Sequence, residues 1–130
     1  MSFITAITLM GLLTLVMVGF EIMFTYVTQG FAYGFSSNRP AIEKSPLGLR
    51  VQRAYENQVQ STAYIIPILA AGAFTGLTGA GVELAALLIV LGRTAFALLY
   101  YTGISFIRVP AFVLGTFPSL YIAYVLLTGV

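Results

Sequence analysis

Long apolar segments, broken by very few charged side chains, constrain the fold of this chain more than any other feature. Of its 130 residues, 59% are hydrophobic and 8% are charged, whereas a soluble domain carries about 25% charged residues. One helical crossing of a bilayer needs about 20 residues, so four crossings leave room only for short connections. We therefore expect a single transmembrane domain over residues 1–130, surrounded by lipid.

The apolar segments predict an all-α, four-helix membrane bundle. The expected helices cover about residues 2–28, 47–75, 82–101 and 108–128. The first is too long for a signal peptide and lacks basic residues before it and a small-residue cleavage motif, so we expect it to be retained. Polar, turn-forming residues from Gly34 to Pro46 separate the first two helices, and a glycine-rich stretch from Gly76 to Gly81 separates the second from the third.

Basic residues gather near two of the three connections and so predict the orientation of the chain. Arg39, Lys44, Arg50 and Arg53 flank the first connection and Arg108 the third, with none at either terminus or in the second. By the positive-inside rule, the first and third connections face the cytoplasm. Both termini are then expected on the non-cytoplasmic side of an inner (cytoplasmic) membrane.

The residue types that are missing narrow the possible chemistry. The chain has no cysteine and no histidine, which excludes disulfides, thiolate or imidazole metal sites, cysteine nucleophiles and histidine-based triads. We expect no metal site. A net charge of +2 provides no surface for nucleic acid. Any thiol chemistry would need a thiol brought by a substrate or cofactor.

Polar residues of the second helix recur at spacings of three and four. At about 100° per residue, these spacings place Arg50, Arg53, Asn57, Gln60 and Tyr64 on one face. Such a face is costly against lipid, so it should point into the bundle or a subunit interface. It predicts a pocket for an anionic, polar ligand. In the alternative interpretation, the two arginines snorkel to the headgroups while the amides bond neighbouring helices.

The third helix contains an arginine within an apolar run. Arg93 has apolar neighbours on both sides, and Tyr100 lies seven residues later on the same face. An arginine in hydrocarbon is a candidate functional residue that needs a partner. Glu21 and Glu56 are the expected partners, either in a structural ion pair or with Arg93 in direct contact with a ligand.

A further arginine opens the fourth helix. Arg108 follows a short connection and is expected close to Tyr100 and Tyr101, on the same side of the membrane as the polar face of the second helix. The alternative is a simple interfacial anchor ahead of Pro110, which is tolerated in a first helical turn. Together with the second helix, three helices are predicted to direct polar groups to one depth.

These residues carry a resemblance to a known family. The run from Arg50 to Gln60 resembles the signature R-A-x-x-N-x-x-E in the second helix of the MAPEG superfamily, the membrane-associated proteins in eicosanoid and glutathione metabolism. Arg93, Tyr100 and Arg108 are similar to the family's R-x6-Y and the arginine at the start of its last helix. The resemblance covers residues 49–126. It implies a homotrimer with glutathione bound between neighbouring protomers.

The resemblance also implies roles for individual residues. The implied glutathione-binding residues are Arg50, Arg53, Asn57, Gln60, Arg93, Tyr100 and Tyr101. Arg108 is the implied catalytic residue, because its guanidinium favours the glutathione thiolate, which attacks an electrophilic carbon or a hydroperoxide. This chain departs from the family pattern at Gln60, where the family has a glutamate. An amide there provides a neutral hydrogen bond to the ligand's amino group in place of an ion pair.

Three functions are compatible with these patterns. The resemblance implies a membrane-bound, glutathione-dependent transferase or peroxidase acting on lipophilic electrophiles that enter from the bilayer. Alternatively, Gln60 marks a lost cofactor site, and the chain is a non-catalytic binding or scaffold protein or a subunit of a larger membrane complex. A third hypothesis is a small exporter that couples protons through Glu21, although such a transporter has no use for the arginines of the second helix.

Overall fold

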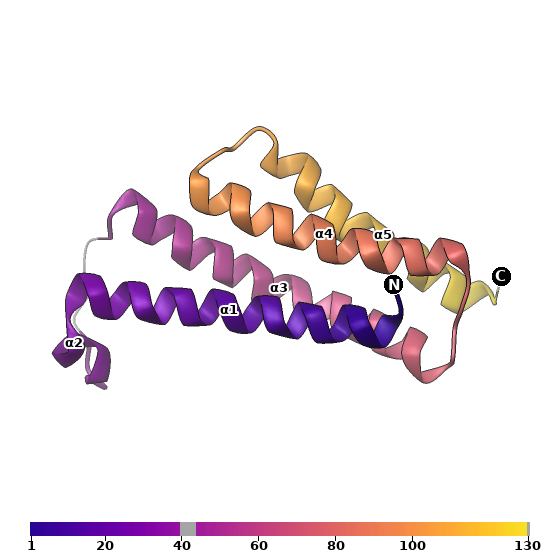
Figure 1. The fold of residues 1–130 in the computed structure, drawn as a ribbon, viewed down its shortest axis with the longest axis horizontal. Helices are drawn as coiled ribbons and strands as arrows, with labels where there is room; N and C mark the ends of the chain where they lie inside the picture. The colour runs from indigo at the N-terminus through magenta and orange to yellow at the C-terminus, as the bar shows by residue number, and fades with distance from the viewer. Residues whose placement is uncertain (40–43, 130) are drawn as a thin grey trace.

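The computed structural model describes residues 1–39 and 44–129, and all regular secondary structure in these residues is helical. The helices are α1 (Phe3–Gln29), α2 (Phe31–Phe35), α3 (Pro46–Phe74), α4 (Ala80–Thr102) and α5 (Arg108–Thr128). The four long helices lie side by side and alternate in direction, with both termini toward the same end (Figure 1). The expected all-α class is therefore confirmed.

Membrane crossing is supported for three of the four long helices. Within the described residues, α1, α4 and α5 are long and apolar enough to span a bilayer. Helix α3 has 29 residues and is long enough, but the charged and amide side chains in its first half make it too polar to be counted as a membrane-spanning helix. It packs against α1 and also contacts α4 and α5. Protein thus replaces lipid around part of the polar surface of α3.

Local capping residues determine where the long helices begin and end. The hydroxyl of Ser45 accepts a hydrogen bond from the Gly48 N–H at 3.1 Å, and Pro46 occupies the first turn of α3. At the end of α4, Gly103 adopts a left-handed conformation with φ 80°, which favours glycine. The short connection that follows returns the chain along α4 as α5.

Helix α2 corrects the expectation that the loop after the first helix begins at Gly34. The structure places Gly34 and Phe35 in α2. The rings of Phe31 and Phe35 lie 5.3 and 5.5 Å from the ring of Tyr26, and a Cβ on Gly34 would overlap that same ring. Aromatic packing against the end of α1 therefore stabilises one more helical turn. Residues 40–43, also assigned to the loop, lie outside the described residues.

The interior consists of two apolar clusters separated by a polar layer. The larger cluster, near the termini, includes Phe3, Met10, Ile65, Leu69, Ile89 and Ile122. The smaller cluster, toward the other end, contains Met17, Ala54 and Ala97, with Tyr100 and Tyr101 packed against it. Between the two clusters along their helices lie Thr14, Gln58 and Arg93. This layer is the centre of the candidate site.

Candidate functional site

Arg93 is fully buried and bonded to two amides of α3. Its exposed fraction is 0%. The Nε–H donates to Oε1 of Gln58 at 3.0 Å, and NH2 donates to Oδ1 of Asn57 at 2.8 Å. The Gln58 amide in turn donates to the hydroxyl of Thr14 at 3.1 Å. We call these four side chains the Arg93 network. It joins α1, α3 and α4 through hydrogen bonds inside the protein.

Aromatic rings and two glycines complete the surroundings of Arg93. Its guanidinium carbon lies 4.7 Å from the centroid of the Phe96 ring and 5.9 Å from that of Phe112, within the range of cation–π attraction. A Cβ on Gly115 would lie 2.9 Å from Cδ of Arg93, and one on Gly92 would overlap the backbone at Gly115. Because Gly92 and Gly115 carry no side chains, α4 and α5 approach closely and still leave room for the apolar stem of Arg93.

The structure corrects the expected partner of Arg93. The acceptors of its hydrogen bonds are amide oxygens of α3 and not a carboxylate of Glu21 or Glu56. The reason is the direction of the α3 faces: Gln58 is buried, whereas Glu56 is exposed. Amides pair with the cation without adding a second charge to the interior. Its NH1 atom is buried and has no hydrogen-bond partner among the described residues.

The expected polar face of α3 is divided between covered and uncovered residues. Arg50, Asn57 and Tyr64 are partly buried, whereas Arg53 and Gln60 are exposed on the single chain. The phenol of Tyr64 lies 3.1 Å from the hydroxyl of Thr116 on α5. These residues thus lie along the border of the surface that α3 packs against its neighbours. Helices α4 and α5 cover only the inner part of this polar face.

Two arginines contact consecutive residues at the end of α4. The Nε–H of Arg50 donates to the carbonyl oxygen of Tyr101 at 3.2 Å. The guanidinium carbon of Arg108 lies 4.3 Å from the centroid of the Tyr100 ring. The start of α3 and the start of α5 therefore each place a cation at the end of α4. The contact of Arg108 with Tyr100 agrees with the proximity expected from the sequence, and Arg50 lies at the next residue of α4.

Sequence reasoning missed two members of the Arg93 network, Gln58 and Thr14. Gln58 shares a helical face with the small or apolar residues Ala54, Ser61 and Ile65, at spacings of three and four, and this spacing is the sequence signal for its burial. Its neighbour Asn57 continues the spacing that begins at Arg50 and so belongs to the adjacent polar face. Thr14 lies in an apolar helix and gives no comparable sequence signal.

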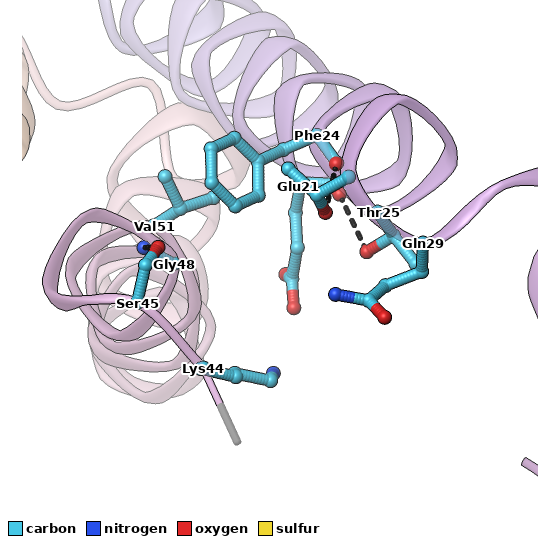
Figure 2. A pocket seen from close by; sticks show the side chains of 9 residues that line it. Glu21, Phe24, Thr25, Gln29, Lys44, Ser45, Gly48 and Val51 are labelled. Atoms are coloured by element: carbon cyan, nitrogen blue, oxygen red, sulfur yellow. Dashed lines mark hydrogen bonds between the residues drawn. The ribbon is translucent and has the colours of Figure 1, made fainter. Parts of the chain in front are cut away.

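A cavity of about 200 Å³ lies apart from these residues, between the end of α1 and the start of α3 (Figure 2). Its lining includes Glu21, Phe24, Lys44 and Val51. None of the glutathione-binding or catalytic residues expected from the sequence lines it. The candidate site formed by the arginines and tyrosines is thus a surface at the border of α3, α4 and α5 and not this cavity.

Apolar helices long enough to span a bilayer, with a buried cationic network between them, define an integral membrane protein of the all-helical class. The sequence model of the MAPEG family matches residues 3–128, nearly the whole chain. The protein therefore belongs to the MAPEG family, which includes glutathione-dependent transferases and peroxidases. No individual curated protein and no solved structure matches the sequence significantly.

Proposed function

We propose that this protein is a membrane-bound, glutathione-dependent transferase or peroxidase that acts on lipophilic electrophiles. The observation that carries the proposal is the contact of Arg50 and Arg108 with Tyr101 and Tyr100, consecutive residues of α4. A guanidinium is always charged and binds carboxylates through two parallel hydrogen bonds. Two such groups at one end of the bundle favour a small ligand with several negative charges. Family membership supplies the reaction class.

The side chains along the border of α3 suit the acidic parts of glutathione. Arg50 and Arg53 are donors for its carboxylates. The Oδ1 atom of Asn57 is engaged by Arg93, which leaves its NH2 group as a donor for the ligand. Gln60 offers an amide oxygen to the amino group and no charge. The donor set therefore fits the anionic ends of glutathione more strongly than its cationic end.

Glutathione would supply the thiol that this chain lacks. A neighbouring cation stabilises the deprotonated form of a thiol, which is the more nucleophilic form. We assign this role to Arg108, and we assign Tyr100 as the aromatic support that orients its guanidinium. Electrophiles dissolved in the bilayer would reach the reacting sulfur along the apolar surfaces of the helices.

We further propose that a neighbouring copy of the chain covers the outer edge of the site, in a homotrimer. Arg53 and Gln60 are exposed on the single chain although they lie in a helix packed beside membrane-spanning helices. Polar side chains against lipid are unfavourable, and a protein neighbour removes that cost. In this proposal the arginine-rich end faces the cytoplasm, in an inner membrane, and both termini face the opposite side.

Titration with glutathione tests the proposed function. The purified protein in nanodiscs should show a saturable ultraviolet thiolate absorbance, which Arg108→Ala abolishes. Arg39→Ala is the control, since it removes an exposed arginine that follows α2 and is not assigned to glutathione, and it should leave the absorbance unchanged. The absence of saturable absorbance in the wild type would overturn the proposal, as would a wild-type signal in Arg108→Ala.

A second candidate is a non-catalytic scaffold or a subunit of a larger membrane complex. The observation that favours it is the neutral residue Gln60, which lies exposed where the resemblance places a carboxylate. Native mass spectrometry of the gently extracted protein separates the two functions. Stable association with other subunits, without glutathione, supports the scaffold. A free homotrimer that carries glutathione contradicts it.

A further inference from the structure

Glu21 is the only charged residue in the membrane-spanning helix α1. Its side chain is half-buried and lines two neighbouring cavities, whose linings share Glu21 and Thr25. One, of about 200 Å³, lies toward the start of α3, and the other, of about 230 Å³, extends toward Arg39. An acid placed in a membrane-spanning segment is costly unless it has a partner. Its surroundings therefore call for an explanation.

The carboxylate of Glu21 makes no hydrogen bond or close ion pair with any residue in 1–39 or 44–129, and the ammonium of Lys44 acts on it electrostatically from the other side of the cavity. The hydroxyl of Thr25 bonds the backbone carbonyl of Glu21 at 3.0 Å, not its side chain. A carboxylate has two oxygens, each able to accept more than one hydrogen bond. Both oxygens of the Glu21 carboxylate can therefore accept hydrogen bonds from a ligand in the cavity.

The cavity has an acidic group, Glu21, on the side of α1 and a basic group, Lys44, on the side of α3. Figure 2 shows the side chains of Glu21, Gln29 and Lys44 extending toward the same space from α1 and from the start of α3. Phe24 and Val51 provide apolar surface beside them. Lys44 donates one hydrogen bond to Oε1 of Gln52 at 2.5 Å, which leaves two of its three N–H groups for a ligand.

This arrangement is complementary to a zwitterion. A primary ammonium satisfies Glu21 by hydrogen bonds and charge, and a phosphate satisfies the remaining donors of Lys44. Glu21 is the one acidic residue among the described residues that line the cavity, and it faces the cation Lys44, a donor set that suits an ammonium better than a metal ion. Alkyl groups attached to the zwitterion would lie along Phe24, Val51 and the outer surface of α1.

We propose that this cavity binds a phosphoethanolamine group, with Glu21 receiving the ammonium and Lys44 the phosphate. The same group occurs in an aminophospholipid of the surrounding bilayer and in soluble phosphoethanolamine esters. The site is separate from the arginines assigned to glutathione, so its existence is independent of the function proposed above.

A series of lipids that differ by single methyl groups tests the proposal in the unaltered protein. The chain is extracted from nanodiscs containing equal amounts of phosphatidylethanolamine, its N-methyl and N,N-dimethyl forms and phosphatidylcholine, and retained lipid is measured by native mass spectrometry. Each methyl removes one N–H donor. We expect phosphatidylethanolamine to be retained about tenfold over phosphatidylcholine, with intermediate values between. Equal retention across the series would overturn the proposal.

Three variants connect the preference to the cavity. Glu21→Gln should abolish the preference, whereas Glu83→Gln, which removes a half-buried carboxylate in the first turn of α4, beside the N-terminus, should keep it. Lys44→Gln should lower the retention of all four lipids and leave their ratios unchanged. A wild-type preference in Glu21→Gln, or its loss in Glu83→Gln, would contradict the assignment. If the Glu21→Gln variant does not insert into the membrane, the lipid preference of the wild-type protein across the methyl series tests the proposal by itself.

Competition with soluble glycerophosphoethanolamine distinguishes the two sources of the ligand. Displacement of the bound lipid at comparable concentration supports a soluble ligand of the same chemistry. Retention of the lipid in its presence supports a bilayer ligand.

Discussion

Arg93 of α4 donates from its Nε to the amide oxygen of Gln58 of α3 at 3.0 Å, and both side chains are completely buried. The bond lies between two apolar clusters, where water is excluded. An unsatisfied buried donor or acceptor destabilises a protein, and this hydrogen bond satisfies the donor of Arg93 and the acceptor of Gln58 together. The pair thus holds α3 and α4 in one register, and it provides the first test of the structure.

Removal of Arg93 should destabilise the protein more than removal of any exposed arginine. Arg93→Met leaves the acceptors of Asn57 and Gln58 unpaired, and we expect a loss of about 2–4 kcal/mol in the free energy of unfolding. In the double variant with Gln58→Leu, part of this loss should be recovered, because one orphaned acceptor is removed with its donor. Thermal unfolding in detergent measures both effects.

The control for these variants is Arg39→Met, which removes an exposed arginine. It should lower the free energy of unfolding by less than about 1 kcal/mol. Strictly additive losses in the double variant would show that Arg93 and Gln58 are not coupled.

The close approach of α4 and α5 predicts intolerance of a methyl group at Gly92. A Cβ there would overlap backbone atoms at Gly115, so Gly92→Ala should separate the helices and destabilise the protein by about 1–3 kcal/mol. Gly11→Ala is the matched control, since no atom lies within 4 Å of a Cβ at that helical position. It should be neutral or stabilising by up to about 1 kcal/mol. Equal unfolding temperatures for the two variants would contradict the packing.

The contact between Tyr100 and Arg108 predicts that the ring, and not the hydroxyl, supports the arginine. Tyr100→Leu removes the aromatic face 4.3 Å from the guanidinium and should weaken glutathione-dependent thiolate formation about threefold to tenfold. Tyr100→Phe keeps the face and should stay within about twofold of the wild type. The apparent dissociation constant from the absorbance titration distinguishes them. Parallel loss in both variants would assign the role to the hydroxyl instead.

The aromatic residues of α2 predict that this helix lies at the membrane interface. Phe31 and Phe35 are largely exposed at the end of a membrane-spanning helix, and exposed phenylalanines of a helix that lies on a bilayer insert at the boundary between headgroups and acyl chains. The chain contains no tryptophan, so Phe35→Trp introduces a unique fluorophore. Its emission should be quenched most by lipids labelled near the headgroups.

Leu15→Trp, at an exposed position near the middle of α1, serves as the control for depth. Its emission should be quenched most by lipids brominated near the ends of their acyl chains. Quenching of Phe35→Trp by aqueous iodide alone would place α2 in water and exclude the interfacial position.

Much of the architecture could be predicted because its causes are local. Membrane-spanning helices follow from long segments of predominantly apolar composition, as α1, α4 and α5 demonstrate. Helix α2 was missed because its stability comes from rings that meet in space, those of Tyr26, Phe31 and Phe35. A polar stretch after a long helix contains no local sign of that contact.

For the candidate site too, some features could be predicted from the sequence and others depend on the tertiary structure. Sequence by itself determined the membrane class and the residue types available, since both depend on composition, and motifs in three helices carried the resemblance to the family that the match over residues 3–128 confirms. The tertiary structure decided that Arg93 pairs with Gln58 and Asn57, and that Arg53 and Gln60 remain uncovered. Those outcomes depend on which face of α3 meets α4. That face is selected by the packing of whole helices, including the close approach at Gly92 and Gly115, which no single segment encodes.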